Sequence, residues 1–86
     1  MPCISRFFGI YIYMFHNDHP MPHFHAYYGE DGATINIHTL EVMDGRLSKR
    51  ALRLVKEWAE LHHDELLRNW ELAREKETLT KIEPLE

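Results

Sequence analysis

The segment from His16 to His25 reads H-N-D-H-P-M-P-H-F-H, and it limits what the flanking sequence can form. Pro20 and Pro22 lack a backbone N–H and bias the residues before them toward extended or turn conformations. A regular strand or helix therefore cannot continue through this segment. Because the segment also holds four of the seven histidines, it predicts a histidine-rich loop that joins two regular elements.

The sequence before this loop favours a β-strand. Phe7 to Phe15 is aromatic and β-branched, and it contains no proline and no charged residue. Alternation places apolar side chains on both faces of such a strand. We therefore expect a central strand, or a strand whose second face is covered by a partner.

The sequence after the loop predicts a β-hairpin. His23 to Tyr28 alternates, residues 29–32 supply turn residues, and Ala33 to Ile37 completes the pair. The expected core face carries Phe24, Ala26, Tyr28, Ala33, Ile35 and Ile37. The opposite face carries His23, His25, Tyr27, Thr34, Asn36 and His38. A turn of two or four residues preserves these faces, whereas a turn of three residues would separate the two polar sets. Leu40 to Met43 predicts a short edge strand.

The C-terminal half predicts helices. Ser48 is a favourable N-cap, and apolar residues then recur at helical spacing, at Leu52, Val55, Ala59, Leu66, Trp70 and Ala73. We predict two helices, with a break at residues 62–64 and Asp64 as the second N-cap. The expected fold is a single α+β domain over residues 1–86: a small antiparallel sheet formed by an N-terminal strand plus a β-hairpin, packed against C-terminal helices. Its sheet region is 7–43 and its helical region 48–76, followed by a charged tail, 77–86, whose end docks on the core.

Composition narrows the functional classes. The net charge of −4 argues against a nucleic-acid binder as far as the whole molecule is concerned. Cys3 is the single cysteine, so a disulfide within one chain is excluded, and we expect a reducing cytoplasmic location. Apolar runs stay well below the roughly 20 residues that span a bilayer, so we expect no membrane segment.

His23, His25 and His38 form the first candidate site, because the predicted hairpin places them on one face. Neighbouring imidazoles can act as the acid and base of a phosphodiester cleavage. They can also bind zinc or another divalent metal, and for that role the candidates are His16, Asp18, His19, His23 and His25. The competing interpretation is a polar, solvent-facing side of a half-buried sheet.

The second candidate site is a cationic helix face that begins at Arg46 and continues through Lys49, Arg50 and Arg53. Cations near a helix N-terminus oppose the helix dipole, so helix stability alone would favour acidic residues there. This arrangement favours phosphate or an acidic protein surface as the ligand. The alternative is a solvated helix face whose positive charges are compensated by Glu57 and Glu60.

Several longer segments resemble the domain-of-unknown-function family 4160. They are I-S-R-F-F-G-I at Ile4–Ile10, N-D-H-P-M-P-H-F-H-A at Asn17–Ala26, R-A-L-R-L-V-K-E-W-A-E-L-H at Arg50–His62, E-L-L-R-N-W at Glu65–Trp70, and the terminal I-E-P-L. His19, His23 and His25 fall on histidine positions of the family. Met21 stands where the family usually has proline, which affects the conformation of the loop.

The resemblance implies a small bacterial protein, located in the cytoplasm, whose gene often lies beside one for a second small domain, family 2442. It implies a protein partner of that kind in a toxin–antitoxin-like pair, and it implies no catalytic residues. We therefore expect an uncharacterised protein-binding component of such a pair, which could also form a homodimer, and nucleic acid stays open as a partner. One alternative is a small metal-independent ribonuclease that uses His23, His25 or His38, with Arg50 or Arg53 holding phosphate. The other is a histidine-rich module that binds a divalent metal.

Overall fold

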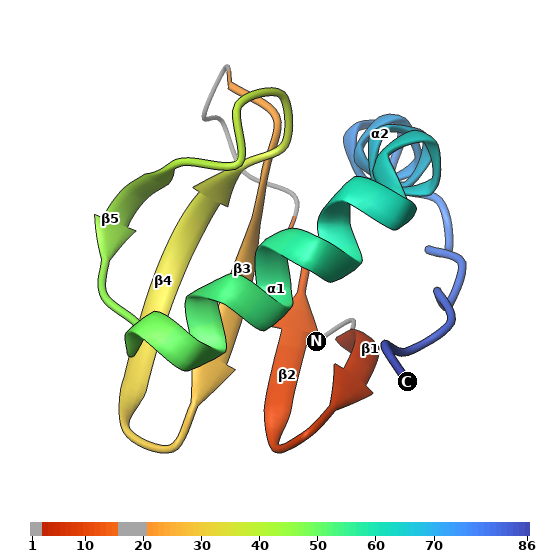
Figure 1. Ribbon diagram of the computed structural model, residues 1–86. Helices are drawn as coiled ribbons and strands as arrows, with labels where there is room; N and C mark the ends of the chain where they lie inside the picture. The colour runs from red at the N-terminus through yellow and green to blue at the C-terminus, as the bar shows by residue number, and fades with distance from the viewer. Residues whose placement is uncertain (1–2, 16–20) are drawn as a thin grey trace.

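The computed structural model describes residues 3–15 and 21–86 of the chain. Its five strands are β1 (Cys3–Phe7), β2 (Ile10–Tyr13), β3 (His23–Tyr28), β4 (Asp31–Asn36) and β5 (Val42–Gly45), and two helices follow, α1 (Lys49–Leu61) and α2 (His63–Arg74). The strands pair antiparallel in the order β1-β2-β3-β4-β5. Helix α1 crosses one face of this sheet, and α2 follows it near one end of the strands (Figure 1). The predicted α+β class is confirmed.

The N-terminal half of the sheet contains one hairpin more than the sequence pattern indicated. The apolar segment that begins at Phe7 is divided between β1 and β2 by a two-residue turn. Both turn residues have positive φ, 50° at Phe8 and 82° at Gly9, as a type I′ hairpin turn requires. An aromatic residue at a left-handed position is uncommon, so Phe8 provided no turn signal in the sequence.

The second hairpin has the faces that the alternation predicts. A two-residue turn at Gly29 and Glu30 places Tyr28 opposite Asp31 and His25 opposite Thr34. The predicted core face is buried at Phe24, Ala26, Ala33, Ile35 and Ile37, but Tyr28, also predicted there, is 37% exposed at the turn. On the side predicted to be polar and solvent-facing, His23 and Asn36 are buried, at 3% and 7% exposure. An edge strand is present as predicted, but it covers Val42–Gly45 rather than Leu40–Met43, and a bulge shifts its register against β4.

The two helices differ in how they begin. The Ser48 hydroxyl accepts a hydrogen bond from the Ala51 N–H at 3.1 Å, as expected for the N-cap of α1. The prediction of Asp64 as the second N-cap is wrong, because α2 starts at His63 and its N-cap is His62, which makes no side-chain cap bond. The backbone N–H of His62 donates to the Trp58 carbonyl at 3.1 Å, and the His62 carbonyl accepts from the Leu66 N–H at 2.9 Å. Trp58 and Leu66, on either side of the break, are both fully buried.

Trp58 of α1 lies at the centre of the core, between the sheet and the C-terminal segment. Its ring lies 5.4 Å from that of Phe7 and 6.0 Å from that of Phe24, measured between centroids. Its indole N–H donates to the Glu83 carbonyl at 2.8 Å. The Ile82 N–H donates to the Ile4 carbonyl at 2.8 Å, so the chain returns along the outer edge of β1 (Figure 1). Within the described ranges, no helix has the length and apolar character needed to cross a bilayer.

Candidate functional site

The side of the sheet opposite the helices carries an unusual set of side chains, and we call it the open face. Because side chains alternate along a strand, burial of Ile10, Ile12, Phe24 and Ala26 against the helices directs their neighbours to the other side. Paired residues share a face, so the strand registers identify the rest of the set. The open face consists of Arg6, Tyr11, Tyr13, Phe15, His25, Tyr27, Gly32, Thr34 and Asp44. His23 lies on the same side by alternation, but it is only 3% exposed, because Trp70 of α2 packs against it.

Four aromatic rings of the open face, those of Tyr13, Phe15, His25 and Tyr27, form one continuous cluster. Tyr13 stacks on Phe15 at 5.9 Å and meets Tyr27 edge-on at 5.5 Å, between ring centroids. The His25 ring lies 4.8 Å from Phe15 and 6.4 Å from Tyr27. Arg6 lies over the ring of Tyr11, with its Cζ 5.6 Å from the centroid. Tyr11 and Tyr27, which pair across β2 and β3, are 39% and 40% exposed.

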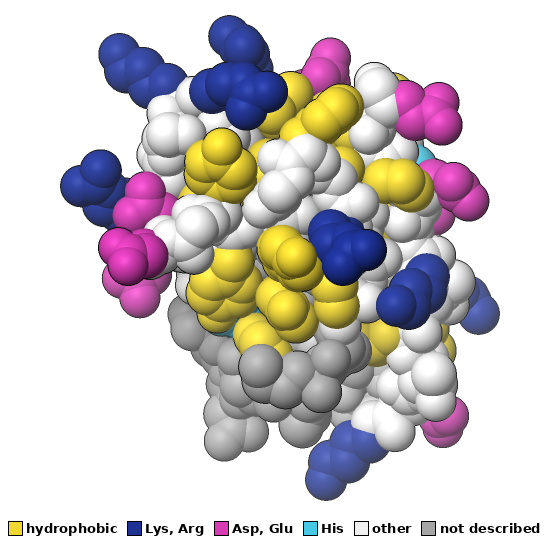
Figure 2. Space-filling view, turned by 90° about the horizontal axis from the view of Figure 1, so that it is seen from below, with side chains coloured by type: hydrophobic (Ala, Val, Ile, Leu, Met, Phe, Trp, Pro, Cys, Tyr) yellow, Lys and Arg dark blue, Asp and Glu magenta, His cyan; other side chains and the backbone are white. Residues whose placement is uncertain are grey.

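The exposed apolar surface continues to the end of the sheet where the two hairpin turns lie. Phe8 is 53% exposed there, and Tyr28 is 37% exposed. Figure 2 views this end and shows hydrophobic side chains gathered in its middle, with acidic and basic side chains around them. A soluble domain seldom leaves adjoining large apolar side chains exposed without a use for them.

Two hollows flank the cluster. The first lies over β3 to β5 and is lined by His25, Tyr27, Gly32, Ala33, Thr34, Asp44 and Gly45. Two positions of this lining require glycine, because a Cβ on Gly45 would lie 2.1 Å from the Gly32 carbonyl oxygen and a Cβ on Gly32 would lie 2.6 Å from the Tyr27 ring. The second hollow lies between β1 and the C-terminal segment, and its lining includes Arg6, Tyr11, Tyr13 and Lys81.

Two of the predicted histidines lie together. The rings of His23 and His25 are 5.2 Å apart. His23 is 3% exposed and contacts Trp70 of α2 at 5.0 Å. Its Nδ1 lies 2.8 Å from the Met21 carbonyl oxygen, and because a carbonyl can only accept, this nitrogen carries the proton. The Nδ1 of His25 bonds to the Thr34 hydroxyl at 3.3 Å, while its Nε2 is buried with no hydrogen-bond partner in the described part of the chain.

The third predicted histidine lies elsewhere. The Asn36 carboxamide oxygen accepts from the N–H groups of His38 and Thr39 at 2.7 and 3.1 Å and turns the chain after β4. The exposed His38 ring then lies 6.4 Å from that of His63 in α2. The structure therefore brings together the pair His23 and His25 and places His38 beside another element.

The metal prediction rests partly on residues outside the described ranges, because His16, Asp18 and His19 belong to residues 16–20. Within residues 3–15 and 21–86, no group of three or more histidine, cysteine, aspartate or glutamate side chains is arranged to hold a metal ion. His23 and His25 contribute two imidazoles, one fewer than the three protein ligands of a typical catalytic zinc site.

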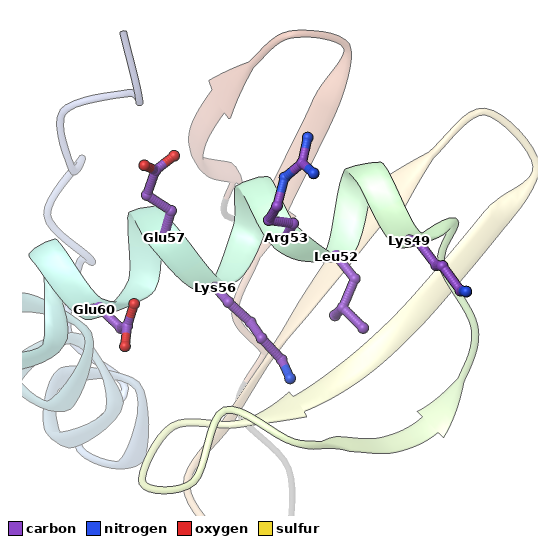
Figure 3. A pocket seen from close by; sticks show the side chains of 6 residues that line it. All are labelled: Lys49, Leu52, Arg53, Lys56, Glu57 and Glu60. Carbon is purple, nitrogen blue, oxygen red and sulfur yellow. The ribbon is translucent and has the colours of Figure 1, made fainter.

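The predicted cationic residues lie on α1 and just before it. Arg46, Lys49, Arg50 and Arg53 are exposed, and no ion pair within the described ranges engages them. The first turn of α1 holds no acidic residue. A groove on this helix is lined by Lys49, Leu52, Arg53, Lys56, Glu57 and Glu60 (Figure 3). Because α1 covers the face of the sheet opposite His25, the structure does not combine these cations with the histidines in one site.

Comparison with known families finds one match, the domain of unknown function DUF4160, over residues 9–71. The chain belongs to this family. The matched part of this DUF4160 chain runs from the β1–β2 turn into α2 and includes most of the open face. Comparison with curated proteins and with solved structures found no match.

In this DUF4160 protein, sequence reasoning did not identify the open face as a site. Tyr11, Tyr13, Phe15 and Tyr27 were interpreted as strand residues, and their signal was the apolar character of both faces between Phe7 and Phe15. A strand with neighbours on both sides and helices on one face needs only one apolar face. The second apolar face of residues 7–15 was therefore the sequence signal that could have indicated a binding surface.

We expect the DUF4160 protein to lose stability as the pH falls below about 6.5. Burial, and secondarily the nearby His23, lower the pKa of His25 from its ordinary value of 6.5. Above 6.5 the imidazole is neutral in both states. Below pH 6.5, the His25 imidazole binds a proton in the unfolded state but stays neutral in the folded state. The free energy of unfolding therefore falls with pH until the pH drops below the lowered pKa of His25 in the folded state. Urea unfolding between pH 5 and pH 7.5 measures this loss.

The matched variants for this measurement are His25→Gln and His63→Gln. His25→Gln removes the group responsible and should flatten the profile between pH 5 and pH 7. His63→Gln changes a histidine whose side chain is 39% exposed and should leave the slope as it is in the natural sequence. If the natural protein and His25→Gln lose stability in parallel as the pH falls, His25 is not the cause of the pH dependence.

Proposed function

We propose that this protein is a protein-binding component of a two-protein, toxin–antitoxin-like pair, and that the open face is its docking surface. The observation that carries the proposal is the aromatic cluster on a sheet face that the described elements leave partly exposed, with Trp70 of α2 packed only against its His23 end. Tyrosine combines a large apolar ring with a polar hydroxyl, and it is enriched at protein interfaces and among the residues that dominate binding energy.

The charges around the cluster favour a protein over a nucleic acid. Binding to nucleic acid draws most of its affinity from cations that neutralise phosphates, and stacking on aromatic rings needs those cations on the same surface. On and beside the open face the charges are mixed, because Arg6, Arg46 and Lys81 are accompanied by Asp44 and Glu83. The cationic residues of α1 lie on the other side of the sheet.

The same geometry leaves the ribonuclease alternative without support. That mechanism requires the acid–base histidines and the phosphate-holding arginines to reach one phosphodiester group, at hydrogen-bond distances of about 3 Å. His25 lies on the open face, whereas Arg50 and Arg53 belong to α1, which covers the opposite face. A binding function needs no such convergence.

The test uses a small protein of family 2442, the partner that the family resemblance implies. Its affinity for the natural chain is measured by isothermal titration calorimetry. The double variant Tyr11→Ser, Tyr27→Ser should weaken binding by about tenfold or more, because each tyrosine at the centre of an interface can contribute more than 1 kcal/mol. Circular dichroism checks that the variant remains folded.

Leu61→Ser is the matched control, because it also replaces an exposed apolar residue, 69% exposed at the end of α1. Its affinity should equal that of the natural chain. If the tyrosine variant binds as tightly as the natural chain, or if Leu61→Ser causes the greater loss, the docking surface lies elsewhere.

A further inference from the structure

We infer that Phe8, at the tip of the first hairpin, anchors this protein to its protein partner, and that the partner receives the Phe8 ring in an apolar pocket. The inference rests on the proposed function, because it names a binding residue for the same partner and the feature of the partner that this residue requires. Three observations support it: the backbone conformation of Phe8, the exposure of its ring, and its position at the end of the open face.

The backbone at Phe8 has a conformation that phenylalanine rarely adopts. Phe8 has φ = 50° and Gly9 has φ = 82°, and the two residues form the turn between β1 and β2. A type I′ turn needs positive φ at both positions, and asparagine, aspartate or glycine usually occupies the first. A bulky side chain is strained in this conformation. The fold alone would therefore be more stable with asparagine at this position.

The Phe8 side chain does not offset this strain through burial. Its ring is 53% exposed, more than any other phenylalanine, tyrosine or tryptophan in the described ranges. It meets the ring of the buried Phe7 edge-on, at 6.5 Å between centroids. Phe8 thus combines a strained backbone with an exposed apolar ring, and stability of the fold accounts for neither.

The other left-handed residues show what compensation looks like. Among the described residues, Leu40 and Lys76 are the other non-glycine positions with positive φ, at 63° and 59°. Leu40 packs its side chain against the core. Lys76 completes the end of α2, where its N–H and that of the next residue donate to carbonyls of the last turn at 3.1 and 2.8 Å. Phe8 has neither form of compensation, and uncompensated strain of this kind points to a function.

Phe8 also lies where it can extend the docking surface. A Cβ on Gly9 would lie 3.2 Å from the Tyr28 ring, so the tip of the first hairpin adjoins Tyr28, which is 37% exposed. Tyr28 follows Tyr27 of the open face along β3. Figure 2 shows apolar side chains gathered at this end, between charged ones. The exposed aromatic surface therefore continues from the open face to the hairpin tip.

The shape and charge of this end indicate what the partner must provide. A ring that protrudes from a two-residue turn fits a recess better than a flat surface, and aromatic residues seated in pockets dominate the energy of many protein interfaces. The exposed, acidic Glu30 stands in the neighbouring turn, and the net charge of −4 opposes approach to an anionic bilayer. An apolar pocket of a protein is therefore favoured over a lipid surface.

The experiment measures two properties of Phe8→Asn in the full chain: its affinity for the family 2442 protein by isothermal titration calorimetry, and its unfolding by urea. The dissociation constant should rise by about tenfold or more, as is common when an anchor residue is removed. The urea midpoint should rise as well, because asparagine suits the left-handed position. Phe8→Leu keeps an apolar side chain and should bind more tightly than Phe8→Asn.

Lys76→Asn is the matched control, because it places asparagine at another left-handed position, far along the chain at the end of α2. Its affinity should equal that of the natural chain. Equal losses of affinity in Lys76→Asn and Phe8→Asn would show that the Phe8 ring is not the cause, and the inference would be wrong.

The outcomes separate this inference from the proposed function. A lower urea midpoint for Phe8→Asn would show that the ring supports the fold, and the inference would fail. If Phe8→Asn binds as tightly as the natural chain while Tyr11→Ser, Tyr27→Ser binds more weakly, the anchor is wrong and the open face stands. Loss in Phe8→Asn with full affinity in the tyrosine variant supports the anchor and overturns the open face as the docking surface. A natural chain that does not bind the family 2442 protein overturns both. Cosedimentation with phosphatidylglycerol vesicles that is lost in Phe8→Asn would make a bilayer the occupant and overturn the inference.

Discussion

Replacing Trp58 with alanine is expected to lower the free energy of unfolding by about 3–5 kcal/mol, the usual cost of removing a large buried aromatic ring. Trp58 is fully buried between Phe7 and Phe24. The substitution also leaves the Glu83 carbonyl without its indole donor. Domains of this size have a total stability of only about 4–13 kcal/mol. Urea unfolding followed by circular dichroism measures the loss.

Two further variants separate the contributions of Trp58. Trp58→Phe keeps most of the buried ring and removes the hydrogen bond to the C-terminal segment, so a smaller loss of about 1 kcal/mol is expected. Leu61→Ala changes a residue of α1 that is 69% exposed and should shift stability by less than about 0.5 kcal/mol. A loss below about 1 kcal/mol for Trp58→Ala would contradict the central position of this ring in the core.

Gly45→Ala is expected to destabilise the protein by about 2–4 kcal/mol, through backbone strain and overpacking together. Gly45 has φ = 79°, a left-handed conformation, and an added Cβ would lie 2.1 Å from the Gly32 carbonyl oxygen. Because that neighbour is backbone, β5 must move away from β4 to admit the methyl group. The free energy of unfolding from urea titration measures the cost.

Gly29→Ala provides the comparison for Gly45→Ala. Gly29 also has a positive φ, 61°, but a Cβ there would meet nothing within 4 Å. Its substitution should therefore cost about 1 kcal/mol, the conformational penalty alone. Equal costs at the two glycines would show that β5 does not approach β4 as closely as the structure indicates.

Much of the fold was predictable because the relevant signals are local. Alternation identified the hairpin faces that bury Phe24 and Ile35, and Ser48 marked the start of α1. The turn at Phe8 and Gly9 was not predictable in this way. It is stabilised by pairing between β1 and β2, and this pairing forces a left-handed conformation on a residue type that seldom adopts it.

The candidate site was predicted less completely than the fold. Two-residue spacing on one strand correctly placed His23 and His25 side by side. The position of His38 depended on the Asn36 turn that follows β4, and that turn directs the chain toward α2. The separation between the cationic residues and His25 depended on which face of the sheet α1 covers. Spacing within α1 contains no information about that choice.

The sequence by itself determined which side chains share a face, because the periods of strands and helices are properties of the local backbone. It therefore determined the apolar core and the continuous aromatic set from Tyr11 to Phe15. The tertiary structure decided what each face meets. Packing of Trp58 against Phe7 and Phe24 placed α1 on one side of the sheet. Burial is a property of the assembled chain, so only the tertiary structure could show that Tyr11 and Tyr27 stay exposed among the described residues.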